Sequence, residues 1–234
     1  MIFAALLRVT GSIGSSAGQI KCRALVLCTA ILADIDSDFP LSLGFNVRQA
    51  ISFQKPSQNM SEYYECTKVG LEFLDQTKNV FKAEEIVRAT PEQIFEVFED
   101  AHAWTVWAMP IQKVEWTSPK PFGVGTTRTV SMMGGMDGYE EFIAWERGKR
   151  MAFSFVACSK DATEKFLEDY RVTDLGNGRC KVEWYMAMET RGFSRHLMWM
   201  TRPVMRMANK RMFRKFREYT EKYAARADAA TPAT

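Results

Sequence analysis

The sequence predicts an α+β domain in which seven strands form a curved antiparallel sheet around one long C-terminal helix, with two short helices after the first strand. Three observations predict this fold. Six strand-like segments separated by turn residues occupy 111–190. One earlier strand, at 80–89, is followed by two short helical patterns, and a long amphipathic pattern at 194–225 comes last.

Composition is that of a globular chain with a sizeable core. The 234 residues are 47% hydrophobic and 25% charged, with 12% aromatic residues and 14 Met that indicate a roomy or adaptable interior. The net charge of +3 is too small to indicate a nucleic-acid partner, and no apolar run reaches the length of a membrane-spanning helix. We therefore expect no nucleic acid and no classical transmembrane segment.

Cysteine and histidine usage argues against disulfides and metal sites. No C-x-x-C pair is present, and two histidines, His102 and His196, lie far apart. We expect no metal and no cofactor, and reduced thiols in a cytoplasmic setting. The five cysteines are Cys22, Cys28, Cys66, Cys158 and Cys180.

Residues 1–60 differ from the rest and are interpreted as a leader that is disordered or precedes the true start at Met60. Lys21 and Arg23 before the apolar run 24–33 are similar to a secretory signal, so a targeting segment is the alternative, although no good cleavage site follows. Asn59 begins a glycosylation pattern that matters only in a secreted chain. Residues 61–78 form an extension in which we expect a short helix.

The first elements of the domain, at 79–225, have clear signals. After the strand at 80–89, Thr90 and Pro91 are typical of a helix N-cap and first turn. A second helical piece at 101–109 contains Trp104 and ends before Pro110.

The residues of the predicted turns indicate that the sheet is antiparallel. Glycine-, proline- and asparagine-rich turns separate the next segments, and such short connections require antiparallel neighbours. The segments are 111–117, 125–133, 138–146, 150–158, 165–173 and 179–190. The last one alternates cleanly, with Val182, Trp184, Met186 and Met188 on one face, whereas 138–146 carries a Glu and apolar residues on both faces and cannot be oriented.

The predicted cover of the apolar face is the helix at 194–225. Its apolar residues recur at spacings of three and four, Pro203 is expected to kink it, and the tail at 226–234 is expected to fray.

Four segments carry a family resemblance over about residues 79–224. Ala89-Thr-Pro91-Glu-Gln-Ile-Phe95 resembles the opening of the SRPBCC (START/Bet v-like) superfamily, and Asp100 with Trp104-x-x-Trp107-x-x-Pro110 resembles its next helix and turn. Trp145 to Phe153 resembles its central hairpin, with Gly148 where proline is common, and Glu168 to Trp184 resembles its closing hairpin. The superfamily has the helix-grip fold and includes polyketide cyclase/dehydrase and lipid-transport proteins.

The resemblance implies a cavity between sheet and helix that binds a hydrophobic small molecule such as a lipid or a polyketide. The chain departs from the iron-containing members, because it has no His-rich iron site. The alternative for the implied lining residues is plain core packing. They are Trp107, Trp116, Val130, Phe153, Phe155, Tyr170, Trp184, Met186, Met188, Met205 and Met212.

Three polar residues are candidates for catalysis, although none is firm. Glu168 and Tyr170 alternate with apolar residues, so an inward Glu168 would have a raised pKa and could bind a polar group or transfer a proton. Arg128 could hold an enolate or a carboxylate if it also faces inward. The alternatives are a Glu168 at the cavity mouth or paired with Arg128, and an outward Arg128.

Charge is distributed unevenly. Residues 190–234 carry 11 bases and 3 acids (+8), whereas residues 61–189 carry 15 bases and 22 acids (−7). A basic amphipathic helix with nearby Met and Trp residues suits an anionic membrane surface, and the alternative is a solvated face. The bases proposed for such contact are Arg202, Arg206, Lys210 and Arg214.

The sequence is therefore compatible with three candidate functions. The lack of a nucleophile–base constellation favours a non-catalytic carrier or sensor of a hydrophobic molecule. The alternative is a cyclase- or dehydratase-like enzyme that uses Glu168, Arg128 or Tyr170. The second alternative is a module that docks on a membrane or a protein through the basic helix, which would make the protein peripherally membrane-associated.

Overall fold

The computed structural model describes residues 63–192 and 194–230. The expectations for the leader, including its signal-like run, the Met60 start and the Asn59 pattern, fall outside the described residues.

The sheet confirms the seven-stranded antiparallel prediction. Its order is β2-β8-β7-β6-β5-β4-β3, so the first strand lies beside the last one, and every pairing is antiparallel. The strands are β2 Val80–Val87, β3 Ile111–Trp116, β4 Thr127–Met132, β5 Met136–Glu146, β6 Arg150–Cys158, β7 Thr163–Asp174 and β8 Cys180–Thr190. A two-residue strand, β1 Tyr64–Glu65, also pairs with β6 beyond the point where β7 leaves it.

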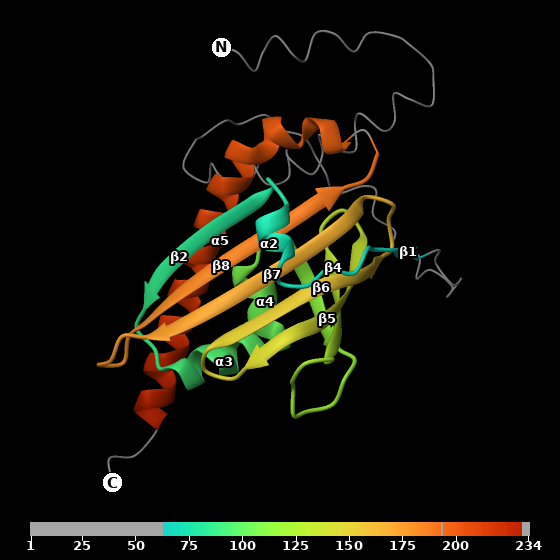
Figure 1. Cartoon of the computed structure of the whole chain (residues 1–234). Coiled ribbons are helices and arrows are strands. Elements are labelled where there is room, and N and C mark those ends of the chain that lie inside the picture. Colours follow the sequence, from blue (N-terminus) through green and yellow to red (C-terminus); the bar gives the residue numbers. More distant parts are fainter. Residues whose placement is uncertain (1–62, 193, 231–234) are drawn as a thin grey trace, which may run out of the picture. The chain divides into compact units, whose positions relative to one another are not determined.

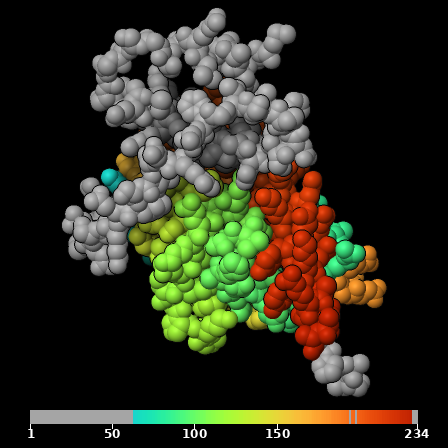
Figure 2. All heavy atoms as spheres, turned by 180° about the vertical axis from the view of Figure 1, so that it is seen from behind, coloured from blue at the N-terminus to red at the C-terminus, as the bar shows by residue number. Residues whose placement is uncertain are grey.

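The helices lie on one face of this sheet, apart from one short helix on the other (Figure 1). α3 (Pro91–Glu99) begins at the predicted cap, where the Thr90 and Gln93 side chains bond to each other's backbone N–H groups. α4 (Ala101–Trp107) follows directly, and Asp100 caps it by accepting from the His102 N–H group. α5 (Ser194–Ala230) packs along β2 and against α4 at the back of the sheet (Figure 2).

The prediction of one short helix at 61–78 is wrong for most of its length. The N–H groups of Cys66 and Thr67 donate to Val156 and Glu164 carbonyls, which keeps this stretch extended along the sheet. Between residues 63 and 78, only α2 (Phe73–Gln76) is helical. Phe73 is buried against Leu167 and Ala187 on the face of the sheet opposite α5, so the extension covers that face.

The prediction of a frayed tail at 226–234 is corrected for 226–230, because α5 continues to Ala230, and residues 231–234 lie outside the described residues. Alanine is the strongest helix former, and five of residues 224–230 are alanine. Asp228 also accepts a hydrogen bond of 2.8 Å from the Gln93 side chain, which ties the last turns to α3.

Pro203 lies inside α5, as predicted. Figure 1 shows the first turns of α5 running at an angle to the rest of the helix. Across the described ranges, no helix is long and apolar enough to cross a membrane.

Candidate functional site

The concave face of the sheet and the inner side of α5 enclose a densely packed group of aromatic rings, which we call the aromatic end. Its residues are exposed by 1% or less. Trp184 stacks on Tyr170 with ring centroids 5.8 Å apart, and Phe216 stacks on Phe98 at 5.2 Å. The members are Phe98, Trp104, Trp107, Phe153, Tyr170, Trp184, Phe213 and Phe216.

Further along the same face, flexible side chains replace the rings. We call this group the methionine end, and four of its six members are only half-buried. Phe166, which is opposite Met188 in the β7–β8 ladder, contacts Phe155, with ring centroids 4.1 Å apart. The members are Met132, Met136, Met186, Met188, Met198 and Met205.

A buried ion pair lies on this concave face. Arg128 on β4 is opposite Glu140 on β5 in the ladder, and its Nε donates to the Glu140 carboxylate. Their side chains are 0% and 3% exposed. The guanidinium carbon lies 4.1 Å from the centre of the Trp104 ring and 4.6 Å from that of Phe153, so the cation is held between aromatic faces.

Glu168 is another buried carboxyl group on this face. It accepts a hydrogen bond of 2.6 Å from the Tyr170 hydroxyl. Burial raises the pKa of Glu168 to about 8, with the charge of Glu140 adding to the rise and the Tyr170 hydrogen bond and Arg128 opposing it. Glu168 is therefore mostly protonated at neutral pH, and the pKa of Tyr170 is itself raised by burial.

Several hydrogen-bond donors of the interior lack a partner. In the part of the chain that the structure describes, both Nη atoms of Arg128 and the indole N–H group of Trp107 are buried without a hydrogen-bond partner, and the Trp184 indole lies close enough to Glu168 to lower the pKa of that carboxyl group. Buried donors left unpaired cost free energy, and an oxygen acceptor would satisfy them. We define the polar cluster as Arg128, Glu140, Glu168 and Tyr170.

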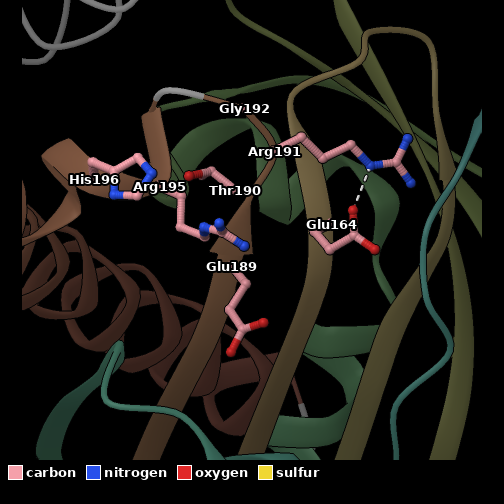
Figure 3. A pocket seen from close by; sticks show the side chains of 7 residues that line it. All are labelled: Glu164, Glu189, Thr190, Arg191, Gly192, Arg195 and His196. Atoms are coloured by element: carbon pink, nitrogen blue, oxygen red, sulfur yellow. Dashed lines mark hydrogen bonds and ion pairs between the residues drawn. The ribbon is translucent and has the colours of Figure 1, made fainter.

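Two open hollows lie at the ends of the elements and not between the aromatic rings. The larger, of about 650 Å³, lies where β8 ends and α5 begins (Figure 3). There Arg191 donates to Glu164 at 2.7 Å, while Arg195 and His196 project from the first turn of α5. The smaller, of about 450 Å³, lies between Pro91 at the start of α3 and the β5–β6 turn at Gly148.

The structure places the sequence-predicted lining residues in three settings. Trp107, Phe153, Tyr170 and Trp184 belong to the aromatic end, where rings fill the space between sheet and helix. Met186, Met188 and Met205 belong to the methionine end, beside Phe155. The remaining three lie at the margins of these groups: Val130 is buried, Met212 is half-buried, and Trp116 is half-buried against Phe122.

The three polar candidates come together on the concave face. Arg128 faces inward, and the alternative that Glu168 pairs with Arg128 is wrong, because Arg128 pairs with Glu140 while Glu168 is buried beside Tyr170. Arg128 and Glu168 lie near enough for the cation to lower the pKa of the carboxyl group.

Sequence reasoning missed two polar residues of the interior. Glu140 was hidden because both faces of the 138–146 segment carry a Glu and apolar residues, whereas the structure turns Gly138, Glu140 and Phe142 inward. Asn209 is buried on the inner side of α5, and its Nδ2 lies 3.9 Å from the Met186 sulfur. A polar residue among the apolar positions of the α5 stripe was the available signal for Asn209.

The four bases proposed for membrane contact differ in their surroundings. Arg202 donates two hydrogen bonds to the Asn79 side chain, the shorter of 2.8 Å, and is half-buried. Arg206, Lys210 and Arg214 are exposed.

A family model described as polyketide cyclase/dehydrase and lipid transport matches residues 79–224 of this chain. Among curated proteins, an uncharacterized protein of Mycobacterium tuberculosis is 46% identical over 158 residues, which are 68% of this chain and 94% of that protein. A Mycobacterium bovis protein matches to the same extent.

Two solved structures share the fold. The Zhui aromatase/cyclase of Streptomyces sp. R1128 aligns with a TM-score of 0.51 and 14% identity, covering 66% of this chain and 98% of that one. A Thermus thermophilus protein aligns with a TM-score of 0.51 and 16% identity, covering 65% of this chain and 99% of that one. At these identities the two structures support the fold alone.

Proposed function

The chain belongs to the polyketide cyclase/dehydrase and lipid transport family, and from this premise we propose that it binds a hydrophobic small molecule that carries an oxygen acceptor. The apolar part of the ligand lies between the sheet and α5 at the methionine end. Its oxygen reaches the polar cluster. Methionine side chains are unbranched and change conformation easily, so we expect this end to rearrange around a bound ligand.

The observation that supports this proposal is the pair of unpartnered Nη atoms on Arg128. A guanidinium fully removed from water has five N–H donors to satisfy, and Glu140 accepts from Nε. A carbonyl, carboxylate or phenolate oxygen could accept hydrogen bonds from these Nη atoms. At neutral pH the mostly protonated Glu168 can also donate to that oxygen or accept from a ligand hydroxyl.

Two measurements test the proposal. Native mass spectrometry of freshly purified full-length protein is expected to show a retained apolar molecule. Calorimetric titration then compares 1-naphthoate with naphthalene, which has the same rings and no oxygen. We expect the naphthoate to bind at least about tenfold more tightly, since one charge-assisted hydrogen bond suffices for that difference.

A matched pair of variants links this difference to the cluster. R128M/E140L replaces the buried ion pair with apolar residues and is expected to abolish the preference for naphthoate. K113M/E115L makes the same change at an exposed pair on β3 and is expected to preserve it. Absence of any retained or bound molecule would refute the proposal, whereas equal binding of both probes would show that the polar cluster does not contact the ligand.

The pKa of Glu168 favours a second candidate function, acid–base catalysis of a cyclisation or dehydration. A carboxyl group with a pKa of about 8 can give up a proton and take one back near neutral pH. The Arg128 cation could stabilise an enolate oxygen as the substrate loses an adjacent proton.

The test of catalysis incubates the protein with a short poly-β-keto thioester and follows product formation by mass spectrometry. We expect turnover with a pH profile that bends near pH 8, and loss of turnover in E168Q. Binding of such a substrate without turnover at any pH would leave the binding function alone.

A further inference from the structure

We propose that the outward face of the first half of α5 docks on the surface of an anionic lipid bilayer. The inference is independent of the interior ligand site. It concerns a set of exposed residues that we call the docking face: Trp199, Met200, Pro203, Arg206, Met207, Lys210, Arg211 and Arg214.

These residues share one side of the helix. Trp199, Pro203, Met207, Lys210 and Arg214 follow one another at spacings of three or four, which places them in line along the helix axis. Every member of the docking face is exposed, whereas Met198, Asn209 and Phe213 between them are buried. The two sides of α5 are therefore distinct along this stretch.

Large apolar side chains form the first part of the docking face. Trp199 is 66% exposed, Met200 56% and Met207 52%. A single exposed apolar residue is ordinary, but three within two to three turns of one helix form a patch that water solvates poorly. Tryptophan in particular favours the boundary between lipid headgroups and acyl chains.

Positive charge forms the rest of the face. From residue 192 to 217 the chain contains no acidic residue. The ion pairs that α5 makes within the described ranges use Arg217, with Glu85, and Glu221, with Arg88, so the four bases of the docking face lack an acidic partner there. Unpaired bases beside exposed apolar groups match an anionic bilayer, which offers phosphates above an apolar layer.

The charge pattern alone also suits a nucleic acid, but the apolar part does not. Phosphate contacts would neutralise Arg206, Lys210 and Arg214 and would leave Met200 and Met207 in water. A bilayer accommodates both kinds of side chain. The bases can reach the phosphates of the headgroups while the apolar side chains insert into the layer beneath them.

Sedimentation of the full-length chain with vesicles tests the proposal. Vesicles of phosphatidylcholine alone are compared with vesicles containing about 30 mol% phosphatidylglycerol, whose negative surface attracts bases. We expect binding to the anionic vesicles to exceed binding to the neutral ones at least about tenfold, and to weaken several-fold when salt rises from about 0.05 M to about 0.5 M.

Two triple variants with the same change of charge locate the contact. R206E/K210E/R214E alters the docking face and is expected to lose at least about nine-tenths of the vesicle binding. R179E/K222E/R226E alters three exposed bases elsewhere, in the β7–β8 turn and late in α5, and is expected to keep most of it. Equal losses in the two variants would overturn the proposal, because binding would then follow net charge and not this face.

Tryptophan fluorescence tests the apolar half of the face. Of the six Trp residues, Trp199 is the exposed one, so brominated acyl chains are expected to quench the wild type and to leave the W199F variant unquenched. Sedimentation of W199F is expected to persist, since phenylalanine also inserts. Vesicle binding without quenching, or binding of single-stranded RNA in place of vesicles, would each contradict docking by this face.

Discussion

The two ends of the space between sheet and helix are built from different side chains on the same strands. On β8, Trp184 belongs to the aromatic end, and the next inward residues, Met186 and Met188, belong to the methionine end. Rings at the aromatic end contact one another closely and are 1% exposed or less, whereas most of the methionines are half-buried. One sheet therefore combines a group of tightly packed rings with a group of flexible, less buried side chains.

The polar cluster lies at the boundary between them. In the β7–β8 ladder, Tyr170 is opposite Trp184 at the aromatic end, and Glu168 is opposite Met186 at the methionine end. Rigid neighbours hold the polar groups in place on one side, and flexible neighbours permit an approach from the other. The difference between the ends is what allows the proposed binding site to share one interior with a packed core.

The largest expected effect comes from separating the buried ion pair. E140Q leaves the Arg128 cation buried without its countercharge and is expected to destabilise the fold by about 3 to 5 kcal/mol. R128M/E140L, which removes both charges, is expected to recover most of this loss. Urea denaturation measures both, with E115Q at an exposed pair as a control expected to cost less than about 1 kcal/mol. Equal losses in E140Q and E115Q would contradict the burial of the pair.

A comparison of truncations tests whether the two ends differ in rigidity. F216A removes a ring that is 0% exposed and contacts Phe98, Trp107 and Phe213, and is expected to cost about 3 to 5 kcal/mol. M205A removes a half-buried, flexible side chain and is expected to cost less than half as much. Thermal or urea unfolding measures both. Similar costs would mean that the methionine end is packed as firmly as the aromatic end.

The raised pKa of Glu168 predicts how stability depends on pH. Between the ordinary glutamate pKa of 4.5 and about 8, the folded protein holds a proton on Glu168 that the unfolded chain releases. The stability from this group is complete below pH 4.5 and is lost as pH rises to about 8, at up to about 1.4 kcal/mol per pH unit. E168Q is expected to remove that slope in urea titrations across this range.

A control for this slope comes from the other side of β8. Lysine partners, Lys82 first, lower the pKa of Glu183 to about 2, so its stabilisation is lost only as pH falls from 4.5 toward 2. E183Q should therefore leave the slope between pH 4.5 and 8 as it is in the wild type. An unchanged slope in E168Q would mean that Glu168 is solvated.

The smallest expected effect concerns the Tyr170 hydroxyl. Y170F removes the 2.6 Å hydrogen bond that opposes the rise in the Glu168 pKa, so that pKa is expected to move further upward by about one unit or less. Infrared titration of the carboxyl band measures the shift. A downward shift would show that another group, or solvent, controls the ionisation of Glu168.

Most of the fold could be predicted from the sequence because local signals agree with the tertiary structure. Turn residues separate the strands, and Thr90 with Pro91 starts α3 where the cap geometry is found. Alternation placed Val182, Trp184 and Met186 on the inner face of β8, where all three are buried. The prediction was wrong at 61–78, where pairing with β6 overrides the local helical preference.

The site could be predicted only in part. Alternation brought Glu168 and Tyr170 to one face of β7, but the partner of Arg128 depends on the register of β4 with β5. That register runs without a shift from Thr127 opposite Glu141 to Met132 opposite Met136, but residue types cannot orient the 138–146 segment, because both of its faces carry a Glu and apolar residues. How closely the rings of separate elements approach is likewise a property of packing, so the filled aromatic end could not be read from residue types.

Pro203 divides α5 into a short leading part, residues 194–202, and a long trailing part, residues 204–230. A proline has no amide hydrogen, so the carbonyl of Trp199 lacks its usual partner in the helix, and the chain bends there. The turns before this hinge are attached through Met198 and through the bond of Arg202 to Asn79, whereas those after it are anchored by Phe213 and Phe216. The two parts of α5 are therefore held to the sheet by different kinds of contact, a thioether and a side-chain hydrogen bond before Pro203 and packed aromatic rings after it.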